Sequence, residues 1–312
     1  MDIVFIIIGL VLLVAGGDWL LRAAVGMSLR LHIPRMVIGM TVVSFATSAP
    51  ELIVSIKSAL DGFPDIALGN VVGSNIANLG LVLGLTVILS SITVQKNFYK
   101  LDWPSMMLAS LVLFGFIYFD GTIQRWEGGV LFGLLVLFII IMFRNKGNAE
   151  VPDEVSDMEG HVPGGWKIFF FLLIGGGALW GGSELLIRGA VGMAQLYGVS
   201  ERVIAVTVVS VGTSIPELAA SVMAVLRKEK AISLGNLIGS NVFNVLAVLG
   251  ITGMITPIQA KDERLISNDI YWMLGYAVLV FLLVLVPKRM RLGWPEGIVL
   301  LGLYIAFVYV TL

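Results

Sequence analysis

The sequence predicts an all-α polytopic membrane protein, with ten transmembrane helices arranged as two inverted five-helix repeats. Three observations predict this class: a strongly apolar composition, ten apolar segments of about spanning length, and an internal repeat whose copies are separated by an odd number of spans. Of the 312 residues, 58% are hydrophobic and 13% are charged, whereas soluble domains average about 45–50% and about 25%. A lipid bilayer is the solvent in which most of a protein surface can lack charge.

The charge balance and the cysteine count exclude several classes of protein. The chain carries 20 Lys and Arg against 21 Asp and Glu, a net charge of −1, so no basic surface for nucleic acid is expected. It contains no cysteine, which excludes disulfides, thiolate catalysis and cysteine metal sites. The first apolar stretch, residues 3–21, lacks a positive n-region and is longer than a typical signal-peptide core. We therefore expect this stretch to be the first transmembrane helix.

Apolar runs recur along the whole chain and are separated mostly by short polar connections. One connection is longer and acidic, which predicts a solvated cytoplasmic linker between two halves. The chain is thus divided into a first repeat at 1–143, an acidic linker at 144–166 and a second repeat at 167–312. The ten predicted helices cover residues 3–24, 37–60, 66–90, 104–119, 126–143, 167–193, 203–226, 231–256, 270–286 and 295–311.

The distribution of basic residues predicts the orientation in the membrane. With the N-terminus outside, 14 of the 20 Lys and Arg residues fall on the cytoplasmic side and 6 fall on the outer side. The positive-inside rule therefore favours both termini outside and the acidic linker inside. We expect an integral protein of the cell (inner) membrane, surrounded by the lipid bilayer and without an obligatory protein partner.

An internal repeat is the most informative feature of the sequence. Residues 37–86 align without a gap on residues 203–252, with an offset of 166 and 25 identities in 50 positions. Five predicted spans separate the two copies, so the second copy is inserted upside down relative to the first. Inverted repeats are typical of secondary transporters that alternate access around a site near the bilayer midplane. A duplicated helical bundle need not transport anything, but the identities concentrate in polar residues, which favours transport.

Each copy of the repeat places one glutamate in an otherwise apolar span, directly after a proline. Glu51 and Glu217 occupy equivalent positions, and a carboxylate at the membrane centre costs at least about 2.5–3.5 kcal/mol. A cation or a proton is expected to neutralise them, because no Lys, Arg or His lies in the same clusters. Each proline interrupts its helix and frees carbonyl groups one turn earlier. We expect the carbonyl groups of Ser44 and Ser210 to act as additional ligands.

Hydroxyl and amide side chains accompany the two glutamates. A spacing of four residues places both members of a pair on one side of a helix. Hydroxyls, amides and carboxylates are hard oxygen donors, which suit Ca²⁺ and, we expect, Na⁺, whereas zinc and copper sites would need His or Cys. The four pairs are Thr47 with Glu51, Ser74 with Asn78, Thr213 with Glu217, and Ser240 with Asn244.

The paired TS-P-E and GN…GSN…N motifs, inverted between the halves of a ten-span chain, resemble those of the calcium/cation antiporter superfamily. The sodium/calcium exchanger branch, in its prokaryotic type, is the most similar, and the resemblance covers essentially the full length. It implies that Glu51 and Glu217 clasp Ca²⁺ at the centre of the site. It also implies an Asn or Asp ligand at the positions of Asn78 and Asn244. The implied flanking Na⁺ ligands are Thr47, Ser48, Ser74, Thr213, Ser214 and Ser240.

Two positions depart from the family pattern. Ala46 precedes Thr47 where the family commonly has glycine, and alanine still permits tight packing. Some members carry Asp in one repeat where this chain has Asn244. With Asn at both 78 and 244, the site holds two formal negative charges rather than three. Two charges match one Ca²⁺, but they leave the number of exchanged Na⁺ ions and any K⁺ dependence open.

The resemblance implies a secondary active transporter that exchanges Na⁺ for Ca²⁺ by alternating access. The long first spans of the two repeats, 3–24 and 167–193, would slide against a core of spans two, three, seven and eight. Ca²⁺ and Na⁺ are then transported ligands, and neither a resident cofactor nor an enzymatic activity is expected. An H⁺/Ca²⁺ antiporter is the closest alternative. A cation channel with a glutamate ring is a weaker alternative, and an intramembrane enzyme with paired carboxylates is the weakest.

Overall fold

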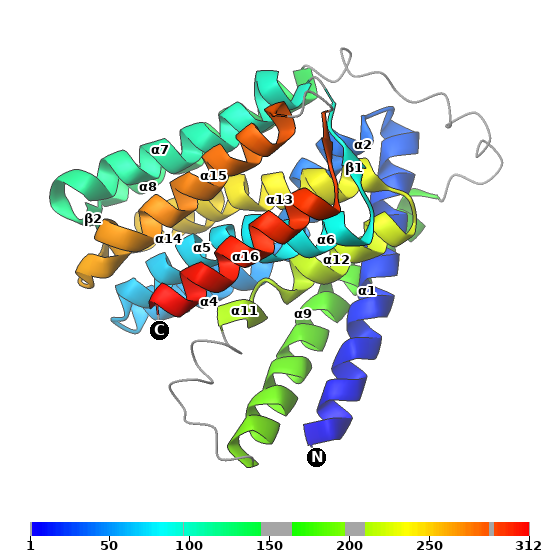
Figure 1. Cartoon of the computed structure of the whole chain (residues 1–312), viewed down its shortest axis with the longest axis horizontal. Helices are drawn as coiled ribbons and strands as arrows, with labels where there is room; N and C mark the ends of the chain where they lie inside the picture. The colour runs from blue at the N-terminus through cyan, green and yellow to red at the C-terminus, as the bar shows by residue number, and fades with distance from the viewer. Residues whose placement is uncertain (1, 96, 145–163, 197–209, 287–289, 312) are drawn as a thin grey trace. The chain divides into compact units, whose positions relative to one another are not determined.

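The computed structural model describes residues 2–95, 97–144, 164–196, 210–286 and 290–311. In these ranges the chain is almost wholly helical, with short π-helical turns inside several helices and four strands of two residues each (Figure 1). Eight helical segments of the described residues are long and apolar enough to cross a membrane, or nine if one bent helix pair counts as a single span. The protein is therefore a polytopic, all-helical integral membrane protein.

The number of ten helices stays a prediction. The predicted span at 203–226 lies partly outside the described residues, and its described part is the apolar helix α12, Ile215–Leu226. The bent pair consists of Arg35–Thr47 and Ala49–Leu60, and it corresponds to the single span predicted at 37–60. The predicted acidic linker also lies almost entirely outside the described residues.

The chain divides into two compact units, each of which combines segments from both halves of the sequence. The first unit contains residues 1–47 and 143–236, and the second contains residues 48–142 and 237–312. These packing units differ from the two sequence repeats, because each repeat contributes helices to both units. The ranges 1–143 and 167–312 describe the repeat in the sequence. That they also form two domains stays a prediction.

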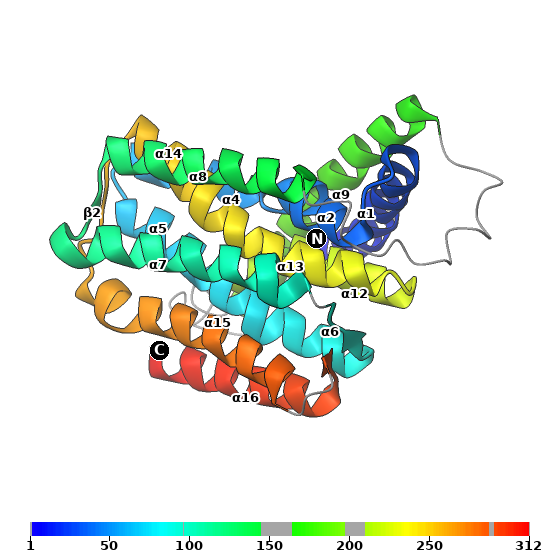
Figure 2. The same cartoon turned by 90° about the horizontal axis from the view of Figure 1, so that it is seen from above.

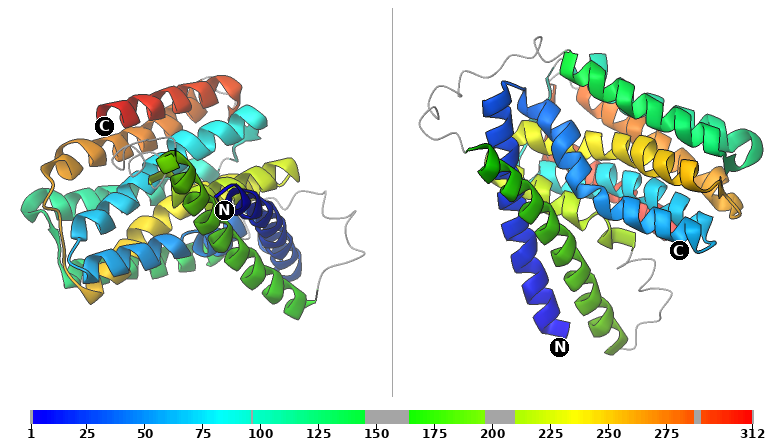
Figure 3. Two further views of the ribbon diagram at one scale, coloured as in Figure 1. Left: turned by 90° about the horizontal axis from the view of Figure 1, so that it is seen from below. Right: turned by 180° about the vertical axis from the view of Figure 1, so that it is seen from behind.

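The first unit is built around two long helices, α1 (Asp2–Leu31) and α9 (Gly165–Leu196), which lie side by side along most of their length (Figures 1 and 3). Glycines allow this close approach: a Cβ atom on Gly175 would lie 2.7 Å from the backbone nitrogen of Leu20. Small residues at such contacts are usual between membrane helices. The other elements are α2 (Arg35–Ile38), η1 (Gly39–Val43), α3 (Ser44–Thr47), α11 (Ser210–Gly212), α12 and the first half of α13 (Lys230–Phe243).

The second unit contains the most buried spans of the chain. In Pro64–Leu89 the most apolar window is 78% buried, and in Lys230–Ile255 it is 83% buried, compared with 22–33% for the other long spans. Its elements are α4 (Ala49–Leu60), α5 (Pro64–Ala77), η2 (Asn78–Val82), α6 (Leu83–Leu89), β1 (Ile92–Thr93), η3 (Phe98–Asp102), α7 (Trp103–Asp120), β2 (Thr122–Ile123) and α8 (Arg125–Arg144). They are followed by η7 (Asn244–Leu249), α14 (Gly250–Ile255), β3 (Ile258–Gln259), η8 (Leu265–Asp269), α15 (Ile270–Leu285), β4 (Arg291–Leu292) and α16 (Trp294–Thr311).

Antiparallel strand pairs and side-chain contacts join the helices of the second unit. Strand β1 pairs with β4, and β2 pairs with β3. Helix α15 lies beside α7 and α16 (Figure 2), and the hydroxyl of Tyr276 donates to the carbonyl oxygen of Leu300 over 3.2 Å. Gly80 is needed here, because a Cβ atom would lie 2.9 Å from the Tyr276 hydroxyl. The contacts hold the buried helices α5 and η2 against the outer helix α15.

Equivalent helices of the two sequence copies have matching bounds. Helix α4 begins at Ala49 and α12 at Ile215, and helix α5 ends at Ala77 where α13 ends at Phe243, so the offset of 166 applies to both. A π-helical turn follows at once in each copy, beginning at Asn78 and at Asn244. The sequence repeat is thus also a repeat of local structure. The inverted orientation of the two copies stays a prediction.

Candidate cation site

Both copies of the repeat break their helix directly before the glutamate. Helix α3 ends at Thr47, Ser48 has φ −84° and ψ 4°, and α4 begins at Ala49 with a turn of 44°. Ser214 has nearly the same backbone, φ −88° and ψ 4°, before α12 begins. Proline causes the break at this point, because it has no N–H to donate and fits the first turn of a new helix, where donors are unused anyway. The predicted interruption of both helices is confirmed.

The break places each glutamate in the first turn of a helix and inside the protein. Glu51 lies in the first turn of α4 and Glu217 in the first turn of α12, and both side chains are 0% exposed. A helix N-terminus carries a partial positive charge, which favours the ionised form of a nearby carboxyl group. The carbonyl end of the preceding helix carries the opposite partial charge and suits a cation. Glu217 belongs to the first unit and Glu51 to the second.

In the first unit, buried hydroxyls are connected to Asn236 of α13. The Ser44 hydroxyl donates to the carbonyl oxygens of Gly39 and Asn236, over 2.8 and 2.9 Å. The Thr47 hydroxyl lies 3.3 Å from the Ser44 carbonyl oxygen and 3.2 Å from the Asn236 Oδ1. The Thr47 hydroxyl therefore has two acceptors within reach of its proton. The Ser44 carbonyl, a predicted ligand, already accepts from Thr47.

The second-copy hydroxyls of the first unit lie one turn before Glu217. Ser214 is buried, and its hydroxyl has no hydrogen-bond partner among the described residues, whereas Thr213 is partly exposed. Helix α12 packs against α3, so the second-copy cluster and the segment that carries Thr47 belong to one packed region. The side chain of Ser210 is outside the described part of the structure, so its predicted role stays a prediction.

In the second unit, α4, α5 and η2 carry Glu51, Ser74 and Asn78, in that order, while the end of α13 and η7 carry Ser240 and Asn244. These two serines and two asparagines are all buried, with exposures of 0–1%. Both amide atoms of Asn78 and the Oδ1 of Asn244 lack a hydrogen-bond partner among the described residues. An unsatisfied buried amide costs about 1–3 kcal/mol, so a ligand at this point is the natural explanation. Both asparagines also begin π-helical turns, which occur frequently at functional sites.

Two serines in the same region were not predicted. Ser55 accepts from the Asn70 amide nitrogen over 3.1 Å, and Ser221 accepts from the Asn236 amide nitrogen over the same distance. Asn70 also donates to the backbone oxygen of Glu51 over 3.3 Å, which ties α5 to the glutamate-bearing helix. The signal was in the sequence, because Ser55 and Ser221 are also separated by the offset of 166.

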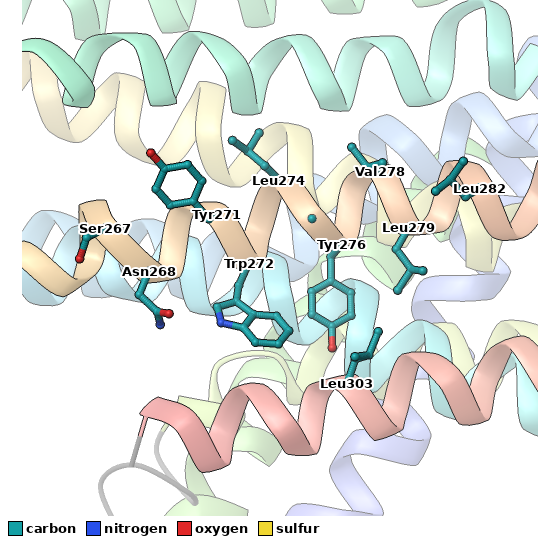
Figure 4. A pocket seen from close by; sticks show the side chains of 11 residues that line it. Ser267, Asn268, Tyr271, Trp272, Leu274, Tyr276, Val278, Leu279, Leu282 and Leu303 are labelled. Atoms are coloured by element: carbon teal, nitrogen blue, oxygen red, sulfur yellow. The ribbon is translucent and has the colours of Figure 1, made fainter.

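A cavity in the second unit has a different lining from the predicted cation ligands. A cavity of about 660 Å³ lies along α15 and is lined mainly by aromatic and aliphatic side chains, among them Tyr271, Trp272 and Leu303 (Figure 4). Its lining contains no carboxylate and none of the predicted ligands. Within the described residues no group of three or more His, Cys, Asp or Glu side chains gathers as a metal site.

Comparison with known proteins decides the family. The family model described as "Sodium/calcium exchanger protein" matches residues 1–144 and 167–312. The chain belongs to the sodium/calcium exchanger family. The inner membrane protein YrbG of Escherichia coli is 33% identical, with 97% of this chain and 94% of that protein aligned. The sodium/calcium exchanger MaX1 of Methanosarcina acetivorans is 29% identical, with 99% and 98% aligned.

A solved exchanger has the same fold. The sodium–calcium exchanger NCX_Mj, in a crystal soaked with zero Na⁺ and Ca²⁺, superposes with a TM-score of 0.83 at 29% identity, covering 100% of this chain and 99% of that one. A crystal of the same exchanger soaked with 10 mM Na⁺ and 10 mM Sr²⁺ also gives 0.83. The family and the fold are those of a cation/Ca²⁺ antiporter, that is, of a transporter rather than an enzyme. The predicted family is confirmed.

Proposed function

We propose that this exchanger couples Na⁺ to Ca²⁺ movement by alternating access, at one mid-membrane site made of oxygen ligands from both repeats. One observation carries the proposal: each repeat holds a buried glutamate in the first turn after a helix break, preceded by a threonine and a serine. Glu51 and Glu217 have this equivalent setting, and in the proposed mechanism they share one divalent cation, as the resemblance to the family implies.

The donor set suits Ca²⁺. Ca²⁺ takes 6–8 oxygen ligands at about 2.3–2.6 Å and tolerates flexible geometry. Two carboxylates balance its charge, and Asn78 and Asn244 offer amide oxygens that have no hydrogen-bond partner among the described residues. The carbonyl groups of Ser44 and Ser210 complete the proposed set at the ends of the interrupted helices.

Hydroxyls next to the carboxylates favour Na⁺ as the coupling ion. A hydroxyl does not titrate near neutral pH and can bind Na⁺ through its lone pairs, whereas coupling to H⁺ needs only the carboxylates. Na⁺ and Ca²⁺ would then compete for overlapping oxygens, and only a loaded site could be occluded and carried across. The proposed Na⁺ ligands are Thr47, Ser48, Ser74, Thr213, Ser214 and Ser240.

The proposed movement is a slide of α1 and α9 over the core helices. The two helices contact each other through glycines. Gly9 and Gly182 face each other with hypothetical Cβ contacts of 2.8 and 2.9 Å to backbone oxygens. With small residues at their contact, the two helices are proposed to shift along each other as they slide over the core.

The test is ⁴⁵Ca²⁺ uptake into proteoliposomes loaded with Na⁺, with K⁺-loaded and pH-jumped vesicles beside them. We expect uptake only with internal Na⁺, and loss of uptake in Glu51→Gln and Glu217→Gln. Glu184→Gln is the matched control, because Glu184 is 51% exposed and pairs with Arg188 on the surface of α9. Uptake driven by a proton gradient alone would instead assign H⁺/Ca²⁺ exchange. Wild-type exchange in either Glu51→Gln or Glu217→Gln would refute the site.

We further propose that the protein resides in the cell (inner) membrane with both termini outside. The similarity to YrbG, named an inner membrane protein, supports the compartment, and the excess of basic residues on one side supports the orientation.

A further inference from the structure

We propose that Asn75 is a positioning residue, which turns the amide of Asn244 so that its oxygen faces the transported cation. The inference rests on the proposed function, because it assumes that Asn244 is a ligand. It concerns side chains of the second unit only: Asn75 on α5, Asn241 on α13, Asn244 at the start of η7 and Met273 on α15.

A chain of two hydrogen bonds connects the three asparagines. The Nδ2 of Asn75 donates to the backbone oxygen of Asn241 over 3.2 Å. The Nδ2 of Asn244 donates to the Oδ1 of Asn75 over 3.1 Å. The exposed fractions of Asn75, Asn241 and Asn244 are 0%, 2% and 0%, so water does not compete for these groups.

The first link of the chain determines the orientation of the rest. A backbone carbonyl can only accept a hydrogen bond, so Asn75 must present its NH₂ group to Asn241. The other end of the Asn75 amide is then an oxygen, which can also only accept. Asn244 must therefore present its own NH₂ group to Asn75, and its Oδ1 is directed to the opposite side. That Oδ1 is the atom without a hydrogen-bond partner among the described residues.

The environment of Asn75 resists the reversed orientation. Its Nδ2 also lies 3.7 Å from the sulfur of Met273, a weak acceptor that is 1% exposed. Turning the Asn75 amide would place its oxygen against two acceptors, the Asn241 carbonyl and this sulfur. In a buried site of low dielectric constant, such an arrangement is strongly disfavoured.

The equivalent residue of the other repeat does something else. Asn241 corresponds to Asn75 through the offset of 166, but its Nδ2 donates to the carbonyl of Leu237 in its own helix, over 2.7 Å. No described residue hydrogen-bonds to the amide of Asn78, the counterpart of Asn244. The two amides thus differ: Asn244 is held as an oxygen ligand in advance, while no hydrogen bond from a described residue fixes the Asn78 amide.

The test measures the KM for Ca²⁺ in Na⁺-loaded proteoliposomes for Asn75→Ala, Asn244→Ala and the double variant. We expect Asn75→Ala to raise the KM by about two- to twelve-fold, the equivalent of one hydrogen bond, with little change in the maximal rate. In the Asn244→Ala background, Asn75→Ala should change the KM no further, because Asn75 acts only through Asn244. Asn268 lies outside the proposed site, in η8 just before α15, and Asn268→Ala should leave the KM unchanged.

Three outcomes would overturn the inference. An unchanged KM in Asn75→Ala, beside a raised KM in Asn244→Ala, would show that Asn244 needs no orientation. If Asn75→Ala raised the KM by the same factor in the wild-type and Asn244→Ala backgrounds, its effect would be independent of Asn244 and would be a general effect on the fold. An unchanged KM in Asn244→Ala would show that Asn244 is not a ligand, and exchange that still depends on Glu51 and Glu217 would then leave the proposed function standing. If Asn75→Ala does not elute as a monodisperse protein, Asn75→Ser repeats the test with a milder truncation.

Discussion

A methyl group at Gly175 should slow the proposed movement of α1 and α9, while the same change two residues away should not. A Cβ atom on Gly175 would lie 2.7 Å from the backbone nitrogen of Leu20 and 3.0 Å from the carbonyl oxygen of Gly16. A Cβ atom on Gly177 would meet nothing within 4 Å. Both residues lie in α9, so Gly177→Ala is a matched control for the helix itself.

The expected change in stability is the sum of two opposing contributions. Replacing glycine by alanine in a helix interior gains about 1 kcal/mol of helix propensity, and forcing a methyl into a filled contact costs about 1–3 kcal/mol. The atoms that the new Cβ meets are backbone atoms of α1, which cannot rotate away. We therefore expect Gly175→Ala to lower the free energy of unfolding by up to about 2 kcal/mol, and Gly177→Ala to leave it unchanged or raise it.

The assay compares thermal unfolding and exchange of the two variants. If the strain increases as the helices slide, a penalty of about 1–2 kcal/mol in the barrier slows the maximal exchange rate by roughly 5- to 30-fold. The KM for Ca²⁺ should change little, because neither glycine is a proposed ligand. A wild-type rate in Gly175→Ala, or an equal slowing in Gly177→Ala, would refute the argument that this contact takes part in transport.

Two further predictions concern binding and orientation. Ca²⁺ at about one hundred times its Kd should stabilise the detergent-solubilised protein by roughly 2.7 kcal/mol. Differential scanning fluorimetry should detect this stabilisation in the wild-type protein and not in Glu51→Gln. An equal stabilisation of both proteins would show that Ca²⁺ binds elsewhere. Because the chain has no cysteine, single cysteine variants report the membrane topology directly. Thr311→Cys should react with an impermeant maleimide added outside, and Val155→Cys should react only after the membrane is opened. The reverse pattern would contradict the predicted orientation.

The fold and the interruption of both glutamate-bearing helices were predictable because each depends on local chemistry that repeats. The apolar runs correspond to the spanning helices, and the prolines at 50 and 216 give helix breaks whose backbone angles agree within a few degrees. A proline acts through its own ring, so its effect does not depend on the rest of the protein. Burial of Glu51 and Glu217 follows similarly, because an apolar span surrounds each of them.

The packing units and the hydrogen-bond partners could not be predicted in the same way. The grouping of residues 1–47 with 143–236 depends on contacts between distant helices, and the apolar pattern does not specify partners. Ser55 and Ser221 read as ordinary polar residues of a helix until the structure pairs them with Asn70 and Asn236. Identical sequence motifs also produced different contacts, because Asn75 and Asn241 have different neighbours.

The different roles of Asn75 and Asn241 follow from the replacement of a charge by an amide. A carboxylate at position 244, as some family members have, offers two equivalent acceptor oxygens and can face a cation in either orientation. An asparagine offers one oxygen and one NH₂ group, and the wrong orientation points two donors at the cation. Removing the charge therefore creates a need to fix the orientation, and the Asn75 oxygen meets that need by holding the NH₂ group 3.1 Å away. The same contact would oppose an ionised aspartate at position 244, because two acceptor oxygens would then face each other. The choice of Asn244 and the hydrogen bond from Asn75 to the Asn241 carbonyl are thus two parts of one arrangement, in which the proposed site would hold two negative charges and still present an oxygen at this position.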